Sequence, residues 1–206
     1  AGNVLVPAGS RVEETFGPAR DVMLNDGSTA RVRPHSRTIY DEGAPNNGIN
    51  AATGQPYSLA TTVISDAVTT GSGPDAVSVV EAVSTIKNGY NPLDGSAVTS
   101  PTSGWTLGTP TTVTDNAGRV TKQIFDPRGK VVTTIAPTSN GDDAGTTRTI
   151  YYTAGPNAAD ASCGNTAQAK AWAGEVCRTF PASAPSEGPS MPSSKVTGYD
   201  YWLAPT

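Results

Sequence analysis

The sequence predicts an all-β fold built mainly from antiparallel hairpins, and three observations favour it. Short runs rich in Val, Ile, Thr and Tyr alternate with a period of two residues, as half-buried strands do. Turn-forming residues separate these runs, and Gly and Pro supply 22 and 17 of the 206 residues, above their average combined share of about 12%. Helical periodicity is weak, and the one stretch of good helix formers, residues 167–173, is long enough for only one or two turns.

The strand elements follow from this alternation. Residues 76–86 form either one bent strand or two short ones, and their β-branched side chains favour a strand over a helix. The clearest unit is a meander over residues 110–136, in which four-residue turns with Asp first and Gly fourth suit a type I geometry. The predicted strands cover residues 29–33, 37–40, 58–65, 76–86, 110–114, 119–125, 130–136, 146–152 and 195–202.

These strands divide the chain into four predicted segments. Residues 1–28 form an N-terminal extended or strand segment, and residues 29–153 carry the hairpin repeats. Residues 154–191 form an irregular insertion that contains both cysteines, and its Pro-rich part at 181–189 is predicted to lie outside any strand ladder. Residues 192–206 form the final strand of a truncated repeat. The abrupt ends of the sequence lead us to expect a fragment of a longer polypeptide.

Composition argues against several function classes. The net charge is −4 with only 16% charged residues and no basic cluster, so the phosphate-neutralising surface of a nucleic-acid partner is missing. No run approaches the roughly 18–20 apolar residues of a membrane span. One His and two Cys are too few for a zinc site of about four ligands. No phosphate loop or dinucleotide fingerprint occurs, so we expect no cofactor.

The two cysteines, Cys163 and Cys177, are candidates for one disulfide. Such a bond would imply an oxidising compartment. Closing the short segment between them would stabilise the fold by about 3 kcal/mol in the chain-entropy model. The alternative is a pair of buried free thiols.

A short motif recurs along the chain. It consists of an aromatic or apolar residue, then Asp, a short gap, Gly and usually a basic residue. The copies are Tyr40-Asp41-Glu42-Gly43, Asp115-Asn116-Ala117-Gly118-Arg119, Phe125-Asp126-Pro127-Arg128-Gly129-Lys130 and a truncated Tyr199-Asp200. The motif resembles the YD repeat of the Rhs family, which has Tyr-Asp, two residues, Gly-Arg and an apolar residue, and the match is strongest across residues 111–136.

The resemblance implies a structural function. In the Rhs family such hairpins pair side by side into a long sheet that spirals into a hollow shell, which in polymorphic toxin systems encloses a toxin domain. The partners implied are other segments of the same polypeptide or identical chains at the sheet edges, together with a toxin cargo. The implied location is secreted or at the cell surface. A low hydrophobic fraction of 36% agrees with units that are stabilised mainly by their neighbours.

Two groups of carboxylates suggest other chemistry. Asp142, Asp143 and Asp160 could bind calcium, but the alternating ligand pattern of a calcium loop is missing, which favours solvated turn residues. The motif aspartates could be the paired acids of a glycosidase. Their regular placement at turns favours a role in accepting backbone hydrogen bonds.

His35 is the remaining catalytic candidate, because histidine suits proton transfer near neutral pH. It is flanked by Pro34 and Ser36, and no nucleophile motif accompanies it. We therefore expect a surface histidine and a protein that is not an enzyme.

The aromatic residues leave one alternative function open, an extracellular carbohydrate-binding or adhesion module with possible cell-wall glycan ligands. Aromatic residues near strand ends more often pack over neighbouring hairpins. The candidates for a stacking platform are Trp105, Trp172, Trp202, Tyr151, Tyr152 and Tyr201. Trp105 and Trp202 are the predicted glycan contacts.

Overall fold

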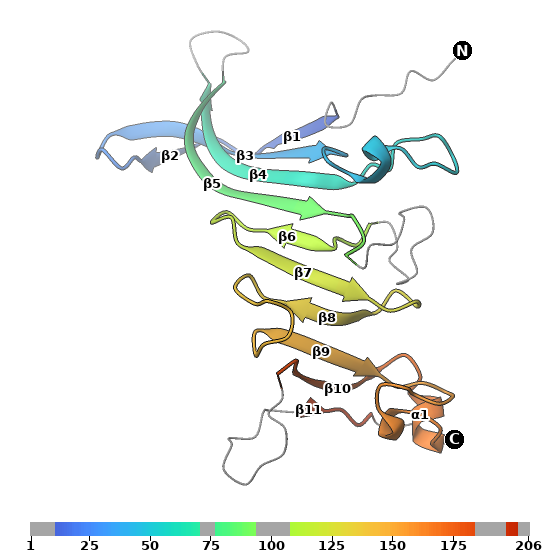
Figure 1. The fold of residues 1–206 in the computed structure, drawn as a ribbon. Helices are drawn as coiled ribbons and strands as arrows, with labels where there is room; N and C mark the ends of the chain where they lie inside the picture. The colour runs from blue at the N-terminus through green and yellow to red at the C-terminus, as the bar shows by residue number, and fades with distance from the viewer. Residues whose placement is uncertain (1–10, 71–76, 94–107, 184–196, 202–206) are drawn as a thin grey trace, which may run out of the picture. The chain divides into compact units, whose positions relative to one another are not determined.

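The computed structural model describes residues 11–70, 77–93, 108–183 and 197–201. The predicted all-β fold is confirmed: the described residues form antiparallel strands with one short α-helix and two 3-10 turns (Figure 1). They fall into two compact units, one made by the part of the chain up to residue 120 and one by the part after it. No helix in the described ranges has the length and apolar character needed to span a membrane.

The first unit is a sheet with the strand order β1-β3-β4-β5-β6, in which β2 also pairs with β3. Every pairing in it is antiparallel. The long element at 77–89 is one continuous strand, which settles the choice between one bent strand and two short ones. The strands are β1 (Val12–Phe16), β2 (Arg20–Met23), β3 (Thr29–Tyr40), β4 (Ala60–Thr70), β5 (Val77–Gly89) and β6 (Thr112–Thr114).

β3 is one continuous strand, although the sequence predicts two shorter strands on either side of Pro34. β2 pairs with residues 29–32 of β3, and β1 pairs with residues 35–39. Pro34 lies between these two pairings, and its carbonyl accepts a hydrogen bond from Gly17 N at 2.8 Å. Its nitrogen faces the same side, at the gap between β2 and β1, where no N–H group is required. The proline therefore marks a change of partner and does not end the strand.

The second unit has the strand order β7-β8-β9-β10-β11. Its strands are β7 (Val120–Phe125), β8 (Val131–Ile135), β9 (Thr146–Tyr151), β10 (Val176–Pro181) and β11 (Thr197–Gly198). β10 lies in the segment predicted to be irregular, so that part of the prediction is wrong. The run Val176–Phe180 pairs along β9, and the surrounding Gly, Ala, Pro and Ser residues conceal this strand in the sequence. The helix α1 (Ala167–Ala171) confirms the expected single short helix.

Buried hydroxyl groups contribute to both units. Thr111 is 1% exposed, and its hydroxyl donates to Asn91 O at 2.6 Å. Thr146 is fully buried, and its hydroxyl lies 2.5 Å from Ser139 Oγ. These hydroxyls satisfy their hydrogen bonds inside the fold, as buried polar groups require.

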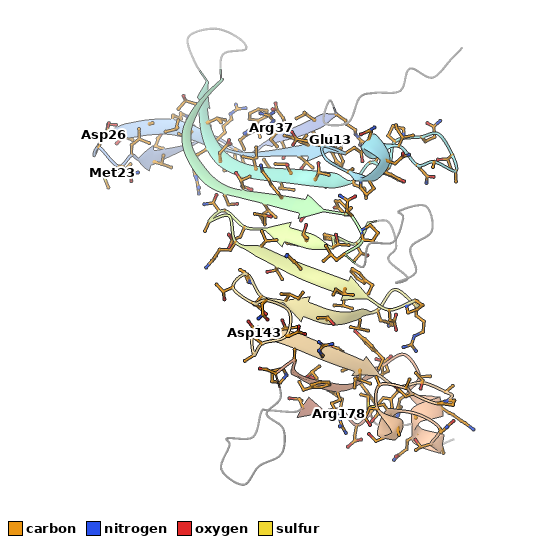
Figure 2. All side chains as sticks on the ribbon, viewed as in Figure 1. Glu13, Met23, Asp26, Arg37, Asp143 and Arg178 are labelled. Carbon is orange, nitrogen blue, oxygen red and sulfur yellow. A yellow bond between two sulfur atoms is a disulfide. The ribbon has the colours of Figure 1, made fainter. Side chains whose placement is uncertain are left out.

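Met23 lies at the tip of the β2–β3 hairpin and is exposed (Figure 2).

Candidate functional site

Two hairpin turns, beginning at Asp115 and Asp126, have the same hydrogen-bond pattern. In each, the Asp N–H donates to the carbonyl four residues later, at 3.0 and 2.8 Å, and Gly118 or Gly129 N donates to the Asp carbonyl at 2.9 Å. Each Asp Oδ1 accepts backbone N–H groups from two and four residues later, all at 2.9 Å. The two glycines have φ of 75° and 78°, where glycine avoids the steric cost of a Cβ. The motif aspartates thus organise their own turns.

Arginine side chains complete both turns. Arg119 Nε donates to Asp115 Oδ2 at 2.7 Å, and this bond together with backbone N–H groups holds the pKa of Asp115 below its usual range. Burial acts to raise the pKa of Asp126, but bonds from Lys130 N and from the Arg128 side chain and backbone outweigh it and lower that pKa. Both carboxyls are therefore stabilised in the ionised form that the turn requires.

Lys130 occupies the position in the second turn that Arg119 has in the first. Its ammonium lies 5.7 Å from the centroid of the Tyr151 ring, within cation–π range. The preceding Phe125 is buried. The basic position of the motif therefore has two different contacts in the two copies.

A third turn of the same backbone type begins at Leu24, where the sequence motif is missing. Leu24 N donates to Ser28 O at 2.8 Å, and Gly27 N donates to Leu24 O at 2.9 Å with a φ of 82° at the glycine. The carboxylate comes from Asp26, which accepts from Ser28 N at 2.9 Å. Sequence reasoning missed this turn because it required Asp at the first position, whereas Asn-Asp-Gly was the available signal.

Asp41 belongs to a different structure from the hairpin turns. It has a left-handed φ of 62° and is 5% exposed. Its carboxylate accepts backbone hydrogen bonds from Ser58 at 3.0 Å and Leu59 at 2.9 Å. Asp41 therefore closes the long connection between β3 and β4. Tyr40 and Gly43 flank this closure.

The last motif copy forms no hairpin turn within the described residues. Tyr199 N donates to Cys177 O at 3.0 Å, and its carbonyl accepts from the Tyr152 hydroxyl at 2.9 Å. Asp200 is exposed. Here the motif residues attach the C-terminal segment to β10 through backbone groups.

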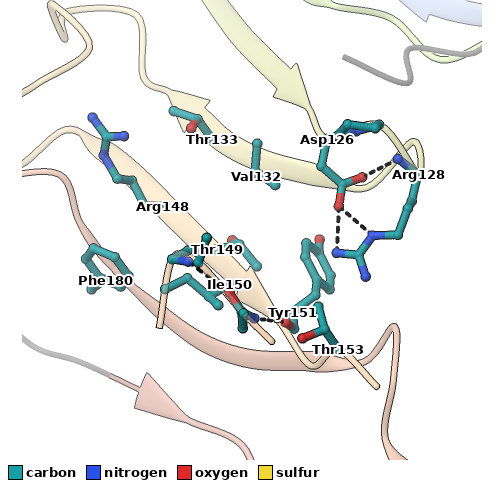
Figure 3. Close-up of a pocket in the computed structure, with 14 residues that line it drawn as sticks. Asp126, Arg128, Val132, Thr133, Arg148, Thr149, Ile150, Tyr151, Thr153 and Phe180 are labelled. Carbon is teal, nitrogen blue, oxygen red and sulfur yellow. Dashed lines mark hydrogen bonds and ion pairs between the residues drawn. The ribbon is translucent and has the colours of Figure 1, made fainter. Parts of the chain in front are cut away.

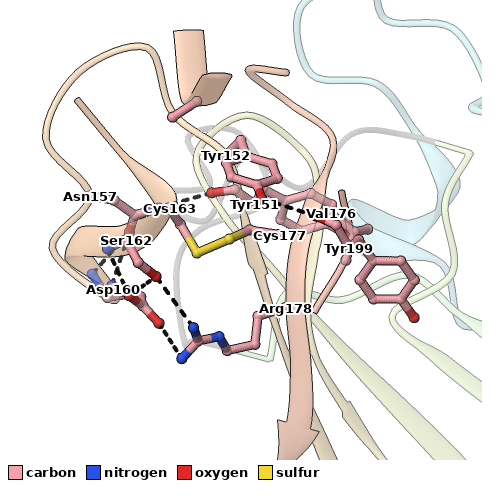
Figure 4. Close-up of a disulfide and its surroundings, with 12 residues drawn as sticks. Tyr151, Tyr152, Asn157, Asp160, Ser162, Cys163, Val176, Cys177, Arg178 and Tyr199 are labelled. Carbon is pink, nitrogen blue, oxygen red and sulfur yellow. Dashed lines mark hydrogen bonds and ion pairs between the residues drawn. A yellow bond between two sulfur atoms is a disulfide. The ribbon is translucent and has the colours of Figure 1, made fainter. Parts of the chain in front are cut away.

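The predicted disulfide is present: Cys163 and Cys177 are bonded, with 5.9 Å between their Cα atoms (Figure 4). Both are buried in the core of the second unit. Beside them, Arg178 forms an ion pair with Asp160 at 2.7 Å, and Asp160 accepts from Ser162 N at 2.9 Å. A disulfide is compatible with an extracellular protein.

Three aromatic residues surround this disulfide. The ring centroids of Tyr152 and Trp172 are 5.2 Å apart, and those of Trp172 and Tyr201 are 5.9 Å apart, both edge-on. Tyr152 and Trp172 are buried in the core cluster. These residues pack inside the fold and do not form an exposed stacking platform. Trp105 and Trp202 lie outside the described residues, so their glycan contact stays a prediction.

The calcium candidates are engaged in local contacts. Asp143 and Asp160 each accept a backbone N–H from two residues later, at 3.0 and 2.9 Å. Asp142 forms an ion pair with Arg148 at 3.1 Å. Among the residues that the structure describes, no group of three or more His, Cys, Asp or Glu could hold a metal ion.

The prediction of a surface histidine is wrong, because His35 is 9% exposed. Its Nδ1 lies 2.5 Å from Asp66 Oδ1, and its ring stacks on Phe16 with centroids 4.6 Å apart. Both partners lie directly opposite it on neighbouring strands. The polar neighbours Pro34 and Ser36 misled the prediction, since contacts across strands decide burial in a sheet.

A cavity of about 520 Å³ lies on the second unit (Figure 3). Val132, Ile150 and Phe180 give it an apolar lining, and Arg128 and Arg148 also line it. Both arginines are paired with aspartates, at 2.8 and 3.1 Å. The one carboxylate in its lining, Asp126, is occupied by its turn. The described lining of the cavity therefore presents an apolar surface whose charged groups are paired.

We compared the chain with known families, curated proteins and solved structures, and no match was found in any of them.

Proposed function

We propose that this chain is a non-catalytic wall segment of a secreted or cell-surface repeat protein of the Rhs/YD type. Its hairpins provide sheet area that continues into neighbouring segments of the same polypeptide or into identical chains. The wall encapsulates or presents a toxin or effector domain encoded elsewhere in the parent polypeptide.

The repeated turn carries this proposal. Asp115 and Asp126 make the same four hydrogen bonds within their turns. An aspartate whose oxygens accept N–H groups at that spacing has a structural role, because its ionised form is already used. Repetition of one turn chemistry is typical of proteins in which each unit is stabilised by its neighbours. The Cys163–Cys177 disulfide supports an oxidising, extracytoplasmic location.

The free edge of β1 supplies the surface at which another segment would pair. Arg11 O accepts from Tyr40 N, and Gly17 N donates to Pro34 O, so alternate backbone groups between them face β3. The other groups face away, and β1 has no further strand beyond it among the described residues. The groups facing away belong to Val12, Glu14 and Phe16. Such an edge is a template for another strand.

A proline substitution tests this edge. Val12→Pro removes an outward N–H and leaves the bonds between β1 and β3 intact, so self-association measured by sedimentation velocity should weaken by about tenfold or more. Val12→Ala is the matched control, because it keeps the N–H group and should associate like the wild type. Equal association of the two variants would argue against pairing through β1.

A glycan titration tests the non-catalytic, structural assignment from a different direction. We expect no saturable binding of cell-wall polysaccharide. Binding that is lost on Trp105→Ala or Trp202→Ala would instead support the carbohydrate-binding alternative.

A further inference from the structure

The only histidine of the chain, His35, is held between carboxylates on two different strands. Asp66 on β4 lies 2.5 Å from Nδ1, and Glu14 on β1 lies 3.9 Å from Nε2. The side chains of His35 and Asp66 are 8% and 7% exposed, whereas Glu14 is 44% exposed. One imidazole therefore connects three adjacent strands of the first unit.

The contact with Asp66 fixes which nitrogen carries the proton in the neutral ring. An ionised carboxylate only accepts hydrogen bonds, so Nδ1 of His35 is the donor. Nε2 then carries a lone pair and can only accept a hydrogen bond. In the described residues this buried atom has no hydrogen-bond partner. The nearest charged group is the Glu14 carboxylate, which cannot donate to it. Neutral His35 thus leaves an unsatisfied acceptor facing a negative charge.

Protonation changes Nε2 from an acceptor into a donor. Glu14 Oε1 is about 1 Å beyond hydrogen-bond range, and its exposed side chain has room to close that gap. The same oxygen lies 3.9 Å from Arg37 Nε, a second buried donor without a partner in the described residues. One small movement of Glu14 would therefore satisfy two orphaned groups at once. The result is a line of alternating charges across β4, β3 and β1.

Other charges near the ring do not provide a competing acceptor. On β3 itself, Arg33 and Arg37 stand two residues to either side on the same face of the strand. On β2, Arg20 lines the same cavity as His35 and Asp66. All three arginines oppose a positive imidazole. The carboxylates of Asp66 and Glu14 favour one. Phe16, paired with His35 on β1, covers the ring by stacking and is uncharged. The acceptor that decides how firmly β1 is held is therefore Glu14.

We propose that His35 is an acid-operated clasp for the edge strand β1. When the imidazole takes up a proton from solvent, its Nε2–H donates to Glu14 and fastens β1 to β3. When that proton is lost, the bond disappears and the edge strand is held less firmly. The pairing edge of β3 is then uncovered more often. This device goes beyond the wall function and does not depend on it.

Hydrogen exchange of the full chain tests the clasp. The amides of Glu13, Thr15 and Gly17 lie on the side of β1 that faces β3, and their protection factors report its opening after correction for intrinsic rates. We expect protection in the wild type to be about tenfold higher at pH 5 than at pH 8, the size of one charge-assisted hydrogen bond. Glu14→Gln should remove this difference. A difference that survives in Glu14→Gln, or is absent from the wild type, overturns the proposal.

Glu13→Gln is the matched control, because it removes the neighbouring carboxylate on the opposite face of β1. Bonds from Arg11 and Tyr40 hold the pKa of Glu13 below its usual range, so it stays charged throughout this pH interval. The variant should lose protection equally at both pH values and keep the tenfold ratio. Loss of the ratio in this control would assign the effect to strand charge in general and overturn the clasp.

The imidazole ¹⁵N shifts provide a test that needs no variant. Because the chain has one histidine, its signals require no assignment. We expect the neutral ring to carry its proton on Nδ1 and the protonated ring to carry protons on both nitrogens. An Nε2–H form at pH 8 would contradict the proposed hydrogen-bond arrangement.

Discussion

Asp115 and Asp126 are related by an identical set of four turn hydrogen bonds, although their side chains differ in exposure. The Asp115 side chain is 39% exposed and that of Asp126 is 12% exposed. The same turn chemistry therefore operates at two levels of solvent screening. This difference makes the two residues a matched pair for measuring what the turn contributes.

Asp126→Ala should destabilise the second unit by about 1–3 kcal/mol, because it removes the charged acceptor of the Arg128 and Lys130 backbone N–H groups. Urea denaturation of the purified chain measures this change. Asp115→Ala should have a smaller effect, since water can replace the lost acceptor at the more exposed turn. Equal effects of the two substitutions would show that burial does not control the turn's contribution.

Acid should weaken the same turn. Burial acts to raise the pKa of Asp126, but hydrogen bonds from Lys130 and Arg128 lower that pKa by a larger amount. Its folded-state pKa therefore lies below the unfolded value. Its contribution is therefore complete above the unfolded value of about 4 and is lost as the pH falls through the lower folded-state value. Thermal melts between pH 7 and pH 2 should show less loss of stability with acid in Asp126→Asn than in the wild type. A parallel pH profile in the variant would contradict this assignment.

The disulfide should stabilise the second unit by about 3 kcal/mol, given its sequence separation of 14 residues. Cys163→Ser with Cys177→Ser should lower the urea midpoint of that unit, followed by the fluorescence of the buried Trp172. The amides of β3 and β4 in the first unit serve as an internal control. Their exchange should not change, and a change there would indicate coupling between the units.

Gly164→Ala should destabilise the same unit by about 1–3 kcal/mol through overpacking. An added Cβ would lie 2.6 Å from Gly155 O and 2.7 Å from Asn157 N, and both are backbone atoms that cannot move aside independently. Gly155→Ala is the control, because its added Cβ meets nothing within 4 Å. Differential scanning calorimetry of the two variants should show a lower melting temperature only for Gly164→Ala.

The features that could be predicted from the sequence are local ones. The turns at Asp115 and Asp126 join residues at most four positions apart, so their residue types indicate them directly. The two-residue alternation within strands and the short helix near residue 167 likewise depend on residues that are close in the sequence. The presence of two cysteines within one segment also allowed the disulfide to be anticipated.

The features that could not be predicted depend on distant residues. Asp41 binds backbone groups 17 and 18 residues away, and His35 is buried against Asp66, 31 residues away. The continuity of β3 through Pro34 depends on which strands lie beside it. Register across a sheet is set by non-local pairing, and alternation within one strand does not reveal it.

The single disulfide also separates the folding of the chain into two stages, one before and one after oxidation. The first unit has no cysteine, so it can reach its fold while the chain is still reduced. The second unit is closed covalently only after both cysteines meet an oxidant. Oxidation would thus act as a separate covalent step that closes the second unit and leaves the first unit unchanged.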